Sequence, residues 1–136
     1  MLRVKLREIL RDTSAEDLEE PLEKLLGELI ERFKPLAVII AGSLAEKRFV
    51  SGLSDVDILV VVDRPVSDAE RFSLVSLGKT DAEVTVVAQE ELERAVRAGN
   101  QFYLNAVRSG KVIYTRRIDA KEPNRAPNAE VEQLLE

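Results

Sequence analysis

Two short apolar runs constrain the fold of this chain most: LAVIIAG at residues 36–42 and SDVDILVVVD at residues 54–63. Both are unbroken and rich in β-branched side chains, which is typical of strands that are covered on both faces. Apolar residues at helical spacing precede them, in residues 2–10 and 18–33. The sequence therefore predicts an α+β domain, of α/β type, in which helices flank one mixed sheet.

Further helices and strands are predicted around and after these runs. Residues 43–50 are expected to form a short helix or turn, and residues 67–78 a helix that ends at Gly78. The remaining pattern predicts two strands and two helices, namely strands at residues 82–88 and 111–116 and helices at residues 89–99 and 101–110. The predicted sheet thus has four strands.

The long amphipathic helix before the first run carries start and stop signals. Thr13 or Ser14 is the expected N-cap, and Asp17 completes a capping pattern three residues after Ser14. Pro21 lies within the helical pattern, so the helix is expected to begin near it. Pro35 is expected to end the helix, because proline cannot continue one.

The chain is expected to hold a single domain over residues 1–118, followed by a linker and short tail over residues 119–136. Its 136 residues are enough for one hydrophobic core. Two Pro and two Asn in close succession indicate an extended linker. We interpret the amphipathic end, with Val131, Leu134 and Leu135, as a frayed terminus rather than as a helix that docks on a partner.

Composition excludes several classes of site. The chain has no Cys and no His, which removes thiol nucleophiles, thiolate zinc sites and every His-based triad. The net charge of −5 argues against long nucleic acid as a partner, because phosphate binding needs Lys and Arg. There is no apolar stretch of about 20 residues and no signal-peptide pattern, so we expect a cytoplasmic protein without a membrane span.

Two acids at the start of the second run are the first candidates for metal-binding residues. If Asp55 and Asp57 belong to a strand, their side chains point to the same face with Cα atoms about 7 Å apart. Carboxylates at this spacing can hold magnesium, including a pair of ions that share them. The alternative is that Ser54 and Asp55 only cap a turn.

A phosphate site and a third acid would complete such a centre. Gly42 allows a sharp turn after the first strand, and Ser43 follows at the expected start of a short helix, where free N–H groups favour phosphate. Glu83 is the preferred third acid, since it precedes an apolar run as Asp57 does. Asp81 is the alternative but lies nearer the turn. A carboxylate there can bind a second ion and accept the proton of an attacking hydroxyl.

Gly42-Ser43, followed after ten residues by Ser54-Asp55-Val56-Asp57, resembles the signature of the DNA polymerase β-like nucleotidyltransferase superfamily. The short chain is most similar to its minimal nucleotidyltransferase group, and the resemblance covers residues 36–115. It implies a mixed-sheet palm, two Mg²⁺ ions, and transfer of a nucleoside monophosphate, AMP from ATP, to a hydroxyl. The residues implied are Gly42, Ser43 and Ser54 for the nucleotide, and Asp55, Asp57 and Glu83 for the metal and catalysis.

The chain departs from the minimal group at two positions. Many members carry Arg-Gly soon after Gly-Ser, where this chain has Glu46-Lys47, so Lys47 or Arg48 is expected to bind the phosphates instead. The third acid is usually Asp, whereas here it is Glu83.

The resemblance also suggests partners. The chain has little room beyond the palm, so the acceptor is expected on a partner protein, or a second subunit completes the site. Minimal members are often antitoxins that modify a HEPN-type toxin at a tyrosine hydroxyl. The alternatives are a binding module that neutralises a partner by contact with little or no catalysis, and a nucleotide-binding regulator.

Four other residues carry weaker signals. Arg64 and Arg71 are interpreted as solvated surface residues. Phe102 and Tyr103 could stack on a base, but helical spacing favours a place in the core for Phe102.

Overall fold

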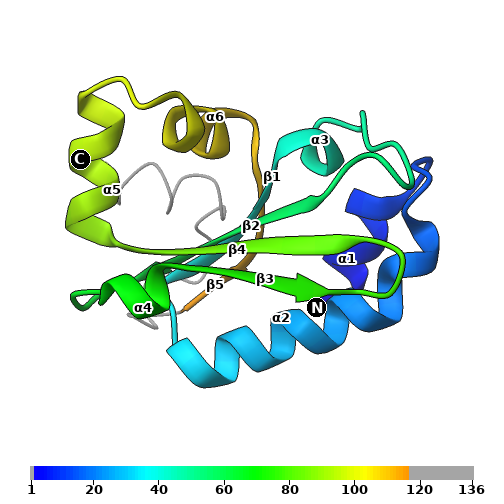
Figure 1. Cartoon of the computed structure of the whole chain (residues 1–136), viewed down its shortest axis with the longest axis horizontal. Helices are drawn as coiled ribbons and strands as arrows, with labels where there is room; N and C mark the ends of the chain where they lie inside the picture. Colours follow the sequence, from blue (N-terminus) through cyan, green and yellow to red (C-terminus); the bar gives the residue numbers. More distant parts are fainter. Residues whose placement is uncertain (1, 117–136) are drawn as a thin grey trace.

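A computed structural model describes residues 2–116 as one five-stranded sheet with helices on both faces (Figure 1). The strands are β1 (Ala37–Ala41), β2 (Val56–Val62), β3 (Phe72–Ser76), β4 (Asp81–Ala88) and β5 (Lys111–Thr115). The helical segments are α1 (Leu2–Leu10), η1 (Glu16–Leu18), α2 (Glu19–Phe33), α3 (Gly42–Ala45), α4 (Asp68–Arg71), α5 (Gln89–Arg97) and α6 (Gln101–Ser109). Across residues 2–116, no helix is long and apolar enough to cross a membrane.

The strand order is β3-β4-β2-β1-β5. Strands β2 and β4 run parallel, whereas the other neighbours are antiparallel. The predicted α+β class with a mixed sheet is therefore confirmed. The predicted tail over residues 119–136 lies outside the described residues, so the proposed domain boundary stays a prediction.

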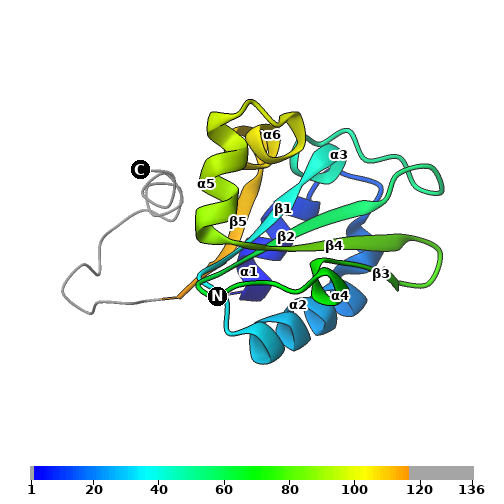
Figure 2. The ribbon, with the colours of Figure 1, turned by 60° about the vertical axis from the view of Figure 1, so that its left-hand side comes forward.

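Two helical layers cover the sheet (Figure 2). Helices α1 and α2 pack on one face, where Ile58 and Val60 of β2 point. Helices α5 and α6 pack on the other face against Leu59 and Val61. Because β2 is buried on both faces, it has the continuous apolar sequence from which a buried strand was predicted.

Residues 67–78 do not form the predicted helix. Only α4 is helical there, and β3 follows as a fifth strand that pairs with β4 at the edge of the sheet. Gly78 lies in the two-residue turn between β3 and β4, with φ of 102°, instead of ending a helix. The backbone hydrogen bonds offered by β4 outweigh a weak local helical preference, and the aromatic and branched residues of FSLVS suit a strand.

Helix α2 begins near Pro21 and ends before Pro35, as predicted, but neither Thr13 nor Ser14 is its N-cap. It stops at Phe33, just before Pro35, with Lys34 in the left-handed region. At its start the preceding Leu18 provides no side-chain cap, and Pro21 is the third helical residue. Ser14 instead donates a hydrogen bond to the carbonyl of Phe49 and accepts one from the Ser51 amide, both at 3.1 Å. The predicted cap thus tethers the loop between α3 and β2.

Candidate active site

Asp57 and Glu83 lie side by side on the sheet face that carries α5 and α6. Parallel pairing of β2 with β4 sets Asp57 opposite Glu83, and both side chains are half-buried. Asp55 is exposed and directly precedes β2, so it reaches the same face by alternation. Two of the acids named from the sequence, Asp57 and Glu83, are therefore in contact near the amino ends of neighbouring strands. Asp55 lies two residues before Asp57, and Asp81 lies two residues nearer the turn than Glu83.

Burial and the neighbouring acids raise the pKa of Asp57 from 3.8 to about 6. Burial of the carboxyl group is the largest cause, followed by its hydrogen bond to Glu83 and then by the negative charges of Glu83 and Asp55. Two carboxyl groups in contact hold a proton between them when no cation is near. The cluster is therefore a site of negative potential that favours a bound cation.

Gly42 lies on the other side of Asp57 from Glu83, because β1 and β4 flank β2. Pairing of β1 with β2 sets Ala41 opposite Asp57, and the next residue, Gly42, has φ of 66°. A Cβ atom on Gly42 would lie 2.1 Å from Oδ2 of Asp57, so any side chain there would displace the carboxylate. Ser43 follows in α3 and is half-buried. Glycine is thus required both by the left-handed backbone and by the close approach of Asp57.

Lys47 is not directed toward the acids. Its ammonium donates hydrogen bonds to the carbonyls of Glu8, Ile9 and Arg11 at 2.8, 2.9 and 2.7 Å. These carbonyls belong to the last turn of α1 and the residue after it, which lack partners within the helix. Lys47 therefore binds the end of α1, at a position where the sequence suggested a phosphate contact.

The two other predicted nucleotide residues of this loop also make local contacts. The Arg48 guanidinium pairs with Glu46 at 3.1 Å, and both residues are exposed. The hydroxyl of Ser54 accepts a hydrogen bond from the Val50 amide at 3.0 Å, and the Ser54 amide donates to the Val50 carbonyl at 2.9 Å. Ser54 thus closes a turn that leads into β2.

A cavity of about 340 Å³ opens beside the acid pair. Its lining combines two acids, one cation, one hydroxyl and three aromatic rings, namely Asp57, Glu83, Arg71, Thr85, Phe72, Phe102 and Tyr103. The prediction that Phe102 belongs to the core is wrong, since 42% of the residue is exposed. Phe72, which the sequence did not single out, is 56% exposed. Strand β3 and helix α6 thus bring aromatic surface to the acids.

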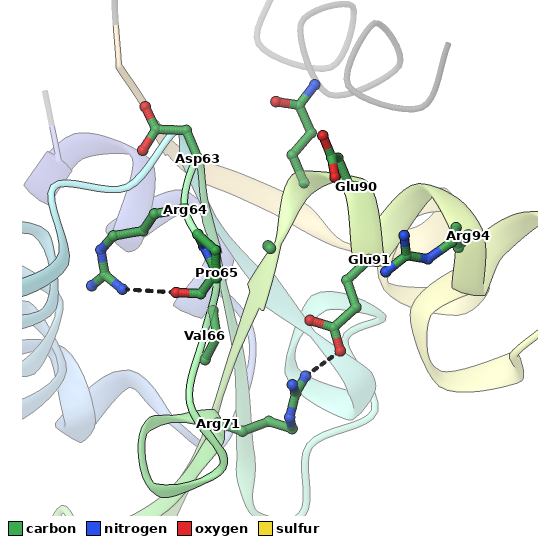
Figure 3. Close-up of a pocket in the computed structure, with 10 residues that line it drawn as sticks. Asp63, Arg64, Pro65, Val66, Arg71, Glu90, Glu91 and Arg94 are labelled. Carbon is green, nitrogen blue, oxygen red and sulfur yellow. Dashed lines mark hydrogen bonds and ion pairs between the residues drawn. The ribbon is translucent and has the colours of Figure 1, made fainter.

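Arg71 separates this cavity from a second one of about 570 Å³ at the carboxyl ends of β2 and β4 (Figure 3). Its guanidinium pairs with Glu91 of α5 and approaches Asp68 at 3.9 Å. The pKa of Tyr103 is raised by burial and then by the charge of Glu91, while Arg71 opposes the rise. The interpretation of Arg71 as a solvated surface residue is wrong, because Arg71 is half-buried and paired with Glu91. Nothing in the local sequence indicates this pair, since the fold alone brings the two residues together.

The donor set fits a divalent cation such as magnesium. The carboxyl groups of Asp57 and Glu83 are in contact, and Asp55 adds a nearby negative charge. A cation would offset these charges, which together with burial raise the pKa of Asp57. As they stand, no three acidic side chains among residues 2–116 converge closely enough to hold an ion. Magnesium bound here would therefore be held by one or two of these carboxylates together with water or substrate phosphates.

Comparison with known proteins identifies the family. Residues 22–125 match the model of the family described as "Nucleotidyltransferase domain". The match runs from α2 to beyond β5 and includes all three acids. A search of curated proteins found none that matches the chain. Because the family model spans more than half of the 136 residues, the chain belongs to the nucleotidyltransferase domain family.

Proposed function

We propose that this nucleotidyltransferase-domain protein is a magnesium-dependent adenylyltransferase of the minimal group, which transfers AMP from ATP to a hydroxyl on a partner protein. The observation that carries the proposal is the contact between Asp57 and Glu83 beneath Gly42, next to a cavity with aromatic walls. A triphosphate would be repelled by these carboxylates alone. Bound magnesium would neutralise them and polarise the α-phosphate.

Each group of the chain would have a separate role in the reaction. The backbone of Gly42 and Ser43 would bind the triphosphate, because glycine allows its close approach. Asp55 and Asp57 would bind the cation. The acceptor oxygen attacks the α-phosphorus and forms the new P–O bond. The bond from that phosphorus to the oxygen bridging to the β-phosphate breaks, and pyrophosphate leaves with the electron pair. The Glu83 carboxylate accepts the proton of the hydroxyl.

The base of the nucleotide would occupy the aromatic cavity. Phe102 and Tyr103 meet edge to face, with ring centroids 5.2 Å apart, and the partly exposed Phe102 ring can stack on a base. Stacking of this kind is worth about 1–3 kcal/mol. Arg71 is the cation of the cavity lining and would face the phosphates once nucleotide competes with Glu91.

The acceptor would be a protein of the HEPN toxin type, which makes this chain the antitoxin of a cytoplasmic toxin–antitoxin pair. The alternative is a module that neutralises its partner by contact with little catalysis. The positions of Lys47 and Arg48 favour this alternative, because neither side chain is directed to the acids in the structure.

Labelled ATP tests the proposal. The protein is incubated with magnesium, the product of the adjacent gene, and ATP labelled on the α- or the γ-phosphate. Transfer of only the α-label to the partner, lost in the Asp55→Asn/Asp57→Asn variant, is the expected result. Glu28→Gln is the matched control, since Glu28 is exposed on α2 and does not line the cavity beside the acids.

Two outcomes would contradict the proposal. Transfer that survives the double variant would show that these acids are not the site. No transfer from the wild-type protein, together with intact binding of the partner, would favour neutralisation by contact.

A further inference from the structure

Strand β3 leaves one edge of the sheet open. It is the outermost strand, and its sequence FSLVS contains none of the charged residues or prolines that protect exposed edges. Phe72 and Leu74 are 56% and 57% exposed. An unprotected apolar edge of this kind can pair with another strand.

The turn between β3 and β4 shows which backbone groups face outward. The Leu77 amide donates to the carbonyl of Thr80 at 2.7 Å, so Leu77 and Thr80 form a hydrogen-bonded pair. Because such pairs alternate along antiparallel strands, Ser73 and Val75 bond to β4. The N–H and C=O groups of alternate residues then point away from the sheet, and these residues are Phe72, Leu74 and Ser76.

We propose that β3 pairs with β3 of a second copy of this chain, antiparallel and centred on Leu74. In this register Leu74 faces Leu74 of the second copy, and Phe72 faces its Ser76. Every outward-facing group of one strand then meets an outward-facing group of the other, as a two-fold interface requires. The pairing joins two five-stranded sheets into one of ten strands.

Charge complementarity supports a second copy as the occupant. The same register brings α4, with the exposed Asp68, near the turn of the second copy that carries exposed Lys79, and the reverse contact forms by symmetry. Along β3 itself no like charges would oppose each other, because the strand has no charged residue.

The pairing would also extend the surface next to the acids. Leu74 lies opposite Glu83 in the sheet, and Phe72 lines the cavity beside it. The second copy would continue this face with its own Leu74 and Ser76. This inference goes beyond the proposed function and does not depend on it, since dimers form or fail to form whether or not transfer occurs.

Charge substitution on the two-fold axis tests the register. Sedimentation of the full chain over a range of concentrations is expected to show a monomer–dimer equilibrium. Leu74→Lys and Leu74→Glu should each weaken the dimer at least tenfold, because each charge meets its own copy. Mixing the two variants should restore dimers. Leu53→Lys is the control, since Leu53 is 85% exposed on a different loop.

A single cysteine gives an independent test in this cysteine-free chain. Hydrogen-bonded antiparallel pairs have Cα atoms about 5.5 Å apart, within the range that a disulfide spans. Leu74→Cys should therefore cross-link into dimers on mild oxidation, and Leu53→Cys should not. A wild-type chain that stays monomeric would overturn the inference and leave the edge for a strand of another protein. A dimer unaffected by Leu74→Lys would overturn it as well.

Discussion

Replacing Asp57 with Asn should stabilise the metal-free protein near neutral pH. The pKa of this carboxyl is raised from 3.8 to about 6 in the folded state, mainly by burial and by contact with Glu83. A raised pKa means that the folded protein binds more protons than the unfolded chain between these two values. Stability therefore falls as the pH rises from about 4 to about 6, and the loss is complete above that window.

The size of the effect follows from the same values. The interval between 3.8 and about 6 corresponds to a ceiling of about 3 kcal/mol, at about 1.4 kcal/mol for each pH unit. Asp57 is only half-buried, so water screens part of this energy, and we expect a gain of about 1–2 kcal/mol for Asp57→Asn at pH 7.5. Well below pH 3.8 the gain should vanish, because Asp57 is then neutral in both states.

Urea denaturation of the wild type and the variant at several pH values, in the presence of a chelator, measures this difference. Glu28→Gln should change stability by less than about 0.5 kcal/mol at every pH, since Glu28 is exposed on α2. Adding magnesium should raise the stability of the wild type more than that of Asp57→Asn, by mass action on the folded state. An Asp57→Asn protein no more stable than wild type at pH 7.5 would refute the reasoning about crowded acids.

Three further predictions test separate contacts, and two of them include a second substitution for comparison. Lys47→Met should destabilise the protein by about 1–2 kcal/mol, because three carbonyls at the end of α1 lose their charged donor, whereas Arg48→Met should have little effect in the same denaturation assay. Gly42→Ala should abolish nucleotidyl transfer and lower stability, since its Cβ would overlap the carboxylate beside it. Gly27→Ala, where a Cβ meets nothing within 4 Å, should stabilise α2 by about 0.5–1 kcal/mol. Phe102→Ala should raise the KM for ATP about tenfold with an unchanged unfolding midpoint, and an unchanged KM would place the base elsewhere.

Features that depend on local pattern could be predicted from the sequence. The buried strands β1 and β2 could be predicted because short, branched apolar runs are typical of buried strands. Alternation alone placed Asp55 and Asp57 on one face. Glu83 was chosen over Asp81 by its position before an apolar run, and the parallel register sets it opposite Asp57.

Features that depend on distant partners could not be predicted in this way. Strand β3 exists because β4 pairs with it, while its own sequence is compatible with a helix. Lys47 finds its carbonyl partners 36 to 39 residues earlier in the chain. Phe102 has the spacing of a core residue, and it is exposed because the sheet face beside the acids is not covered by α6.

The apolar core on the far face of the sheet is what holds Glu83 beside Asp57. A shift of β4 by one residue relative to β2 would turn every side chain of the strand to the opposite face. Ala82 and Val84, on either side of Glu83, are fully buried against the α1 and α2 layer, so such a shift would bury a carboxylate there and expose both apolar residues. That cost exceeds any repulsion between the two half-exposed acids. The packing of α1 and α2 thus enforces the close approach of charges on which the site depends, although neither helix touches it.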